Sequence, residues 1–173
     1  MACNSITLSN IARDCDPSLG GIKKVWLHPY VDNMFTLDAS GISVTAVSVT
    51  TGWTTYEFRR GTGSYTSTQT VDDATGANFY ENELSLQFGR METSKRTAVA
   101  ALAIAEVNGI VLDSNGKYWT LAFDEAASSS GSVGQTGQAK TDSNSYQITI
   151  KDSSKALPYE VAESVVTGLT ISD

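Results

Sequence analysis

The sequence predicts a mainly β protein: an antiparallel β-sandwich or barrel with one flanking α-helix at about residues 93–108 and a long projecting β-hairpin. The composition favours this class, because 21 Ser and 20 Thr accompany 14 Gly and only 3 Pro, as in strands joined by tight turns. Apolar and polar residues alternate through most of the chain, which is the period of half-buried strands. One Ala-rich segment has helical spacing instead. The length of 173 residues suits a single domain spanning residues 1–173.

The first third of the chain is predicted to consist of strands separated by turns. Ile6 and Leu8 alternate with polar residues, and a second strand begins at Ile22. Pro29 indicates the end of that strand or a sheet edge, because proline cannot donate to the ladder. The apolar positions of residues 42–49 change face part-way along the segment, which predicts a β-bulge.

A long β-hairpin is predicted between Trp53 and Phe88. Its base alternates and is expected to pack on the core, whereas residues 65–71 are polar on both faces and Asp72–Gly76 forms the turn. A strand that is polar on both faces gains little from its own fold, so it either frays or finds a partner. A disordered surface loop is the alternative that this composition also allows.

The Ala-rich segment is predicted to be a helix that needs cover on two sides. Thr93 or Ser94 is the expected N-cap, and Asn108-Gly109 is the expected left-handed stop. Ala101 and Ile104 lie off the main apolar stripe and extend the apolar surface around the helix. Its own sheet can cover one side, and a neighbouring subunit or an overhanging loop can cover the other. The stripe expected to pack consists of Ala98, Val99, Leu102 and Ala105.

The chain is predicted to return to strands after this helix. Asp113–Gly116 is a hairpin turn rather than a calcium loop, because the positions that follow lack oxygen ligands and a closing Glu. Ala126–Gly137 is predicted to be a Ser/Gly loop, and residues 161–171 supply one or two last strands. Trp119, Leu121 and Phe123 are expected to face the core, and Tyr146, Ile148 and Ile150 share one face of a later strand.

The inventory of reactive side chains predicts no enzyme. His28 is the only histidine, and no Gly-x-Ser-x-Gly nucleophile elbow occurs. Asp72 and Asp73 form a carboxylate pair at a turn, where solvated charges are expected rather than an acid and a base. Cys3 and Cys15 are expected to stay reduced, with a disulfide between them as the alternative. We therefore expect no catalytic residue, no metal site and no cofactor.

The charge of the chain argues against nucleic-acid recognition. The net charge is −7 and the pI is about 4.6, whereas a surface that grips phosphates needs clustered Lys and Arg. An acidic balance does permit a wall that repels nucleic acid. No run approaches 18 apolar residues, so no membrane span is expected, and the polar first residues predict no secretory signal.

The order of elements between Tyr56 and Ile150 carries a family resemblance. A two-stranded projection leads to Met91-Glu-Thr-Ser-Lys-Arg96, then to the helix, then to Ile110-Val-Leu-Asp-Ser-Asn-Gly-Lys-Tyr-Trp-Thr-Leu121. A late Gly-rich turn and strand follow as Gly134-Gln-Thr-Gly-Gln-Ala-Lys-Thr-Asp-Ser-Asn-Ser-Tyr-Gln-Ile-Thr-Ile150. This order resembles that of the tail tube proteins of long-tailed bacteriophages.

The resemblance implies a structural virion protein made in the bacterial host cytoplasm and assembled into the phage tail. Such subunits form stacked hexameric rings whose inner strands join around a lumen, and a long hairpin contacts the adjacent ring. The implied partners are copies of the chain, other tail or connector proteins, and DNA that passes through the lumen without specific binding; no membrane is implied. Strand addition between copies would satisfy exposed sheet edges. Within residues 62–80, the expected inter-subunit contacts are Thr62, Tyr65, Thr66, Thr68, Thr70, Asp72, Asp73, Phe79 and Tyr80.

Two other classes of function remain open at this point. One is another virion β-sandwich, such as a capsid decoration or head–tail joining protein. The other is a module that binds carbohydrates or cell surfaces, which would usually expose aromatic side chains. Trp26, Trp53 and Trp119 could serve, although two of them lie in strongly alternating segments that are typical of a core. Rings or tubes would indicate the tail tube, and a monomer that binds glycans would indicate the module.

Overall fold

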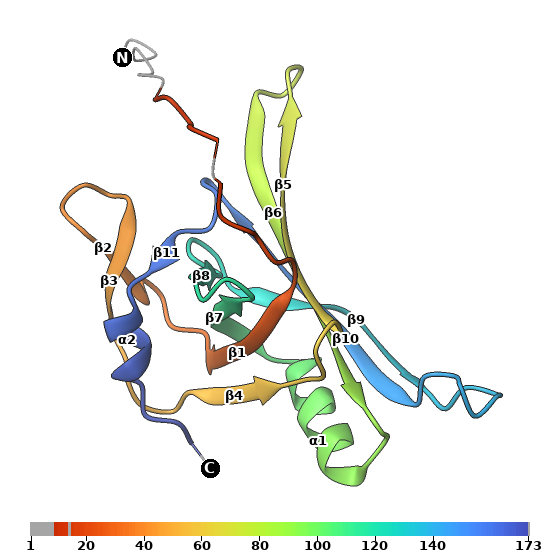
Figure 1. Cartoon of the computed structure of the whole chain (residues 1–173). Helices are drawn as coiled ribbons and strands as arrows, with labels where there is room; N and C mark the ends of the chain where they lie inside the picture. Colours follow the sequence, from red (N-terminus) through yellow and green to blue (C-terminus); the bar gives the residue numbers. More distant parts are fainter. Residues whose placement is uncertain (1–8, 14, 173) are drawn as a thin grey trace.

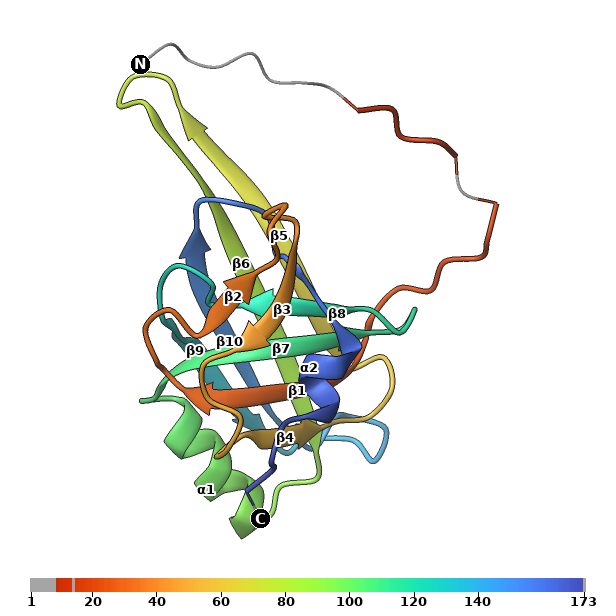
Figure 2. The ribbon, with the colours of Figure 1, turned by 90° about the vertical axis from the view of Figure 1, so that its left-hand side faces the viewer.

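Two layers of strands face each other in the computed structural model, which describes residues 9–13 and 15–172 (Figures 1 and 2). The described residues form a mainly β, sandwich-like fold with two short helices, as the composition predicts. In chain order the elements are β1 (Ile22–Pro29), β2 (Phe35–Leu37), β3 (Ser43–Val47), β4 (Thr54–Glu57), β5 (Gly63–Asp72), β6 (Ala77–Gly89), α1 (Thr93–Leu102), β7 (Glu106–Asp113), β8 (Tyr118–Leu121), β9 (Ala127–Gln135), β10 (Ser145–Ser154), β11 (Glu160–Val161) and α2 (Glu163–Thr167). The predictions for Ile6, Leu8 and Cys3 lie outside the described residues.

The strands form one hydrogen-bonded sheet that is folded into two layers. The first layer runs β2-β3-β11-β8-β7, with β1 and then β4 on the other side of β7. The second layer runs β9-β10-β6-β5. The layers join where Glu106 and Val107 of β7 pair with Ser128 and Ala127 of β9. Among the described strands the pairing is antiparallel, as expected, except between β11 and β3, which pair in parallel.

The main core lies between the two layers and follows from the alternation seen in the sequence. Leu84, Leu86 and Phe88 of β6 point inward beside Ile148 and Ile150 of β10, as alternate residues of a strand must. Helix α1 closes one end of the sandwich below β4 (Figure 1). The other elements contribute further residues to this core, which are Val25, Leu27, Val99, Leu102, Val107, Val111 and Leu121.

A second hydrophobic cluster covers the opposite face of the first layer. Trp26 and Ile110 point to this face, and Trp53 is fully buried there. Helix α2 and the β2–β3 hairpin lie over them (Figure 2). The predicted bulge is present in this hairpin, because Leu37 pairs with Val44 while Thr36 pairs with Ala46.

The expected helix over residues 93–108 is shorter in the structure. It ends at Leu102, and Asn108-Gly109 lies inside β7 rather than at a helix stop. The Asn108 side chain is buried and accepts a hydrogen bond from the Val31 N–H at 2.7 Å. It also donates to the Ala122 carbonyl at 3.0 Å. Pairing of β7 with β1 therefore outweighs the helical preference of this segment.

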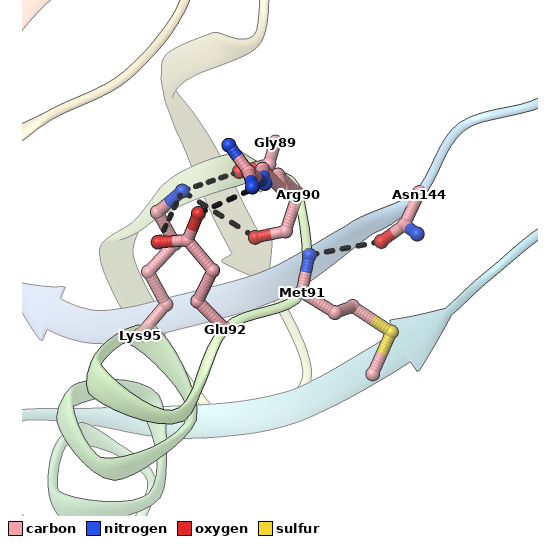
Figure 3. A network of polar contacts seen from close by, with 6 residues as sticks. All are labelled: Gly89, Arg90, Met91, Glu92, Lys95 and Asn144. Atoms are coloured by element: carbon pink, nitrogen blue, oxygen red, sulfur yellow. Dashed lines mark hydrogen bonds and ion pairs between the residues drawn. The ribbon is translucent and has the colours of Figure 1, made fainter.

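The start of α1 also differs from the prediction, because Glu92 is the N-cap and makes no side-chain cap. The strand-to-helix junction is held instead by the contacts in Figure 3. The Met91 N–H donates to Asn144 Oδ1 at 2.9 Å, and the Arg90 N–H donates to the Asn144 carbonyl at 2.7 Å. Lys95 Nζ donates to the Gly89 carbonyl at 2.7 Å. The junction is thus tied to the entry of β10.

Three further predictions for the second half of the chain are wrong. The predicted loop Ala126–Gly137 is largely strand β9, because β10 offers it a partner. Phe123 packs in the second cluster rather than beside Leu121, because Ala122 has a positive φ of 61° and breaks the alternation. The expected strands over residues 161–171 are the short β11 and helix α2, followed by a single bridge. Neither described helix is long and apolar enough to span a membrane.

Candidate assembly interface

The β5–β6 hairpin projects far beyond the two layers, as predicted (Figures 1 and 2). Strand β10 accompanies β6 only as far as Tyr80, which pairs with Ser154. Beyond that point Thr70 to Phe79 have only each other as strand partners within the described residues. The turn is built locally: Asp72 accepts hydrogen bonds from the Gly76 and Ala74 N–H groups at 2.8 and 2.9 Å.

The predicted contact residues fall into two groups in the structure. Thr62 and Tyr65 lie at the base and are engaged within the subunit. Thr62 Oγ1 donates to the Arg59 carbonyl at 2.6 Å, and Tyr65 Oη donates across the sandwich to the Thr120 carbonyl at 2.6 Å. The other predicted residues are the exposed Thr66, Thr68, Thr70, Asp72 and Asp73 and the half-buried Phe79 and Tyr80. Their contact with a second subunit stays a prediction.

A buried polar row marks the point where the hairpin leaves the body. Ser67, Asn82 and Asp152 are cross-strand neighbours on β5, β6 and β10, directly above the last apolar row of the core. Asn82 Nδ2 donates to Asp152 Oδ2 at 3.1 Å. Ser67 Oγ, Asn82 Oδ1 and Asp152 Oδ1 are buried without a hydrogen-bond partner in the described structure. The apolar core therefore ends at a polar row at the hairpin base. Burying its oxygens without partners carries a desolvation cost.

Burial sets the protonation of this row. Burial raises the pKa of the Asp152 carboxyl to about 6, against a smaller opposing effect of the hydrogen bond from Asn82. Burial, with a contribution from the Asp152 charge, raises the pKa of Tyr65 well above its usual value. This row is not among the residues predicted from the sequence. Its signal was present, because Asn82 and Asp152 continue the inward alternation of Leu84 and Ile150.

The second layer ends in two strands with one free edge each. Within the described residues, β5 pairs only with β6. Strand β9 pairs with β10, and with β7 only at Ala127 and Ser128, so the rest of its outer edge has no strand partner in the described structure. Backbone groups on such edges can accept a further strand from another chain.

The predicted packing stripe of α1 is only partly assembled. Val99 and Leu102 are buried in the main core, as expected. Ala98 is exposed, and Ala105 lies after the helix and is half-buried. Ile104, just past the helix, is 88% exposed. The second side of this segment therefore has no apolar cover in the described part of the subunit.

A groove of about 490 Å³ opens between β5 and the first layer. Trp119 forms part of its wall, and its Nε1–H donates to Asp113 Oδ2 at 3.1 Å. Ser67 Oγ belongs to the same wall. The apolar residues of the groove are Leu19, Ile22, Tyr65, Trp119, Leu157 and Pro158. We call this feature the β5 groove.

The residues considered for catalysis are not assembled into a site. His28 is buried in β1, where its Nδ1 lies 2.6 Å from the Pro29 carbonyl and its ring lies 5.4 Å from that of Trp53. Asp72 and Asp73 are exposed at the hairpin turn, and Cys15 is exposed on the surface. The described residues hold no cluster of three or more His, Cys, Asp or Glu side chains that could bind a metal ion.

We also compared the chain with known proteins. No family model, no curated protein and no solved structure matches it. Its function therefore has to be inferred from the hairpin, the free strand edges and the β5 groove.

Proposed function

We propose that this chain is a structural virion protein that assembles with copies of itself into the stacked, hexameric rings of a phage tail tube. One observation carries the proposal: the projecting hairpin is a regular strand pair whose last residues, 70–79, have no further strand partner in the described subunit. Isolated two-stranded hairpins are marginal in water, so an extended hairpin that projects from its subunit is best explained by a contact beyond the subunit.

The free edges of β5 and β9 support lateral assembly. They lie on opposite sides of the four-strand layer β9-β10-β6-β5, so the layer can be extended in both directions by neighbouring chains. Contacts of this head-to-tail kind generate a ring when the rotation between copies closes. The unpaired backbone groups at both edges would then be satisfied in the ring.

The outer face of this layer suits a wall along which DNA slides. It carries Thr66 and Thr68 of β5 beside Glu81 and Glu83 of β6. Lys151 of β10 is paired with both glutamates, at 2.6 and 2.9 Å. With a net charge of −7 for the chain, such a wall would repel phosphates rather than bind them.

A carbohydrate-binding module is the second candidate, because Trp119 lines the β5 groove. Trp26 and Trp53 are buried, which leaves one tryptophan for such a role. Sugar sites usually gain from several exposed aromatic faces, so this candidate has less support.

The oligomeric state of the purified full-length chain tests the proposal. We expect rings or tubes in negative-stain electron microscopy and a species much heavier than 18.4 kDa in sedimentation velocity. The same preparation is applied to a glycan array. A chain that stays monomeric at high concentration and retains glycans would replace the tail tube with the binding module.

A further inference from the structure

Residues 9–13 and 15–18, which precede β1, lie outside the body of the subunit (Figures 1 and 2). Residues 9–13 and 15–20 are exposed, and Ile11 is 98% exposed. The segment reaches the body at Leu19, whose N–H donates to Asn115 Oδ1 at 2.8 Å. Asn115 Nδ2 donates back to the Leu19 carbonyl at 3.1 Å. We call residues 1–18 the N-terminal arm.

The sequence of the arm has the apolar–polar pattern of a strand. From Ser5 to Ile11 it reads Ser-Ile-Thr-Leu-Ser-Asn-Ile, with no charged side chain and with Ile6 and Leu8 in alternation. This pattern is typical of a half-buried strand. At about 3.3 Å per residue, an extended arm of this length reaches about 60 Å, which is enough to cross onto a neighbouring subunit.

The β5 groove offers what such a strand needs. The outer edge of β5 has no strand partner among the described residues, so its outward N–H and C=O groups are open to pairing. The inward side chains of an added strand would enter a groove walled by Ile22, Tyr65 and Trp119. Ser67 Oγ, buried there without a partner in the described structure, offers a hydrogen-bonding group.

We propose that the N-terminal arm of one copy adds as a strand to β5 of another copy, with Ile6 and Leu8 seated in the β5 groove. The proposal rests on the self-assembly proposed above and names what covers one of the two free edges. The arm leaves the body at the rim of this groove, because Leu19 and Gly21 are part of its wall. Residues 9–13 and 15–18 are exposed and run away from the body, which favours the groove of a neighbour over that of the same chain (Figure 2).

Site-directed cross-linking of mixed chains tests the arm exchange. Cys3 and Cys15 are first replaced by Ser in every chain. One chain then carries Thr7→Cys, which lies between the two apolar arm residues. A second chain carries a cysteine at Ser64, Thr66 or Thr68 of β5. We expect an oxidised dimer between the arm cysteine and at least one β5 cysteine, because a disulfide forms only when the two Cβ atoms approach to about 4 Å. The matched control carries Ser132→Cys on the free edge of β9 and should give no dimer with the arm.

The outcomes separate this inference from the proposed function. Rings in which a β5 cysteine cross-links to Ser132→Cys of another copy, and not to the arm, would overturn the arm exchange and leave the tube intact. In a third preparation one chain carries both Thr7→Cys and the β5 cysteine, and a cross-link that forms only within that chain would also overturn the arm exchange. A preparation with no cross-linked species and no rings would overturn both the arm exchange and the proposed tail tube.

A second measurement uses the assembly itself. Replacing Ile6 and Leu8 together by Ser should raise the concentration needed for assembly roughly tenfold or more, because each buried aliphatic side chain contributes measurably to association. The control, Thr7→Ser with Ser9→Ala, should leave that concentration unchanged. Equal assembly of the two variants would contradict a seat for the apolar arm residues.

Discussion

At the scale of single residues, Asp152 makes the stability of the fold depend on pH. It is 4% exposed, and its neighbour Asn82 is 2% exposed, so the carboxylate has little access to water. Burial raises its pKa to about 6 from an ordinary value of 3.8. A carboxyl that binds its proton more tightly when folded stabilises the fold at low pH, and this contribution is lost as the pH rises through 6. The free energy of unfolding is therefore predicted to be higher in mild acid than at neutral pH.

Unfolding by urea at two pH values checks this prediction. Between pH 8 and pH 5 the free energy of unfolding of the natural chain should gain about 1 kcal/mol relative to that of Asp152→Asn, because the variant has no proton to bind at this position. Asp73→Asn, at an exposed turn position, serves as the control and should follow the natural chain. An Asp152→Asn curve parallel to that of the natural chain would show that this carboxyl titrates normally.

At the scale of elements, helix α1 buries only a small part of its apolar surface within its own subunit. Val99 and Leu102 insert into the main core, and the Asn144 contacts fix the start of the helix against β10. Ile104 lies two residues after the helix end and faces solvent. The helix is thus an end cover of the sandwich, and its stability comes from two buried side chains rather than from capping.

Two truncations of similar size test this division. Leu102→Ala should lower the free energy of unfolding by roughly 2–4 kcal/mol, because it leaves a cavity in the main core. Ile104→Ala should change it by less than about 0.5 kcal/mol, because that side chain is already in water. Thermal or urea unfolding of the two variants measures the difference. Similar losses for both would mean that Ile104 is covered in solution, as it would be by another copy.

At the scale of the whole molecule, the subunit divides into a body and a projection. The core between the layers ends at the row of Tyr65, Leu84 and Ile150, and the polar row above it begins the hairpin shaft. Residues that stabilise the body therefore lie on the core side of the polar row, and residues that are free to contact another subunit lie on the side of the hairpin tip. This separation allows the projection to be altered without touching the core.

Shortening the hairpin by two residue pairs uses this separation. Deleting Thr70-Val71 together with Asn78-Phe79 joins the pair Gln69–Tyr80 directly to Asp72–Ala77 and keeps the native turn and the alternation of faces. The tip should retreat by about 7 Å. We expect an unchanged far-UV circular dichroism spectrum and rings that no longer stack in electron micrographs.

A matched change elsewhere controls for the deletion. Removing Gln138 and Ala139 from the exposed loop between β9 and β10 changes the chain at another projecting end. These rings should still stack. Loss of the folded spectrum on shortening the hairpin would contradict the view of a body that is independent of its projection.

Local patterns in the sequence determined much of the fold of this protein. Alternation places Leu84, Leu86, Ile148 and Ile150 in the core, since a strand can bury only every second residue. The polar segment between Tyr65 and the turn has no apolar face to bury. It therefore projects from the core as a strand.

Only the tertiary structure decided where the helix ended, which Ser/Gly segment became a strand and which acid was buried. Asn108 belongs to β7 because β1 supplies a complete partner strand. Residues 127–135 form β9 because β10 supplies their partner strand. Asp152 lies on an inward position that alternation marks, but its depth depends on how far β5 and the first layer cover it. A local pattern sets the period of side chains, whereas the length of an element and the burial of a polar group depend on partners distant in the sequence.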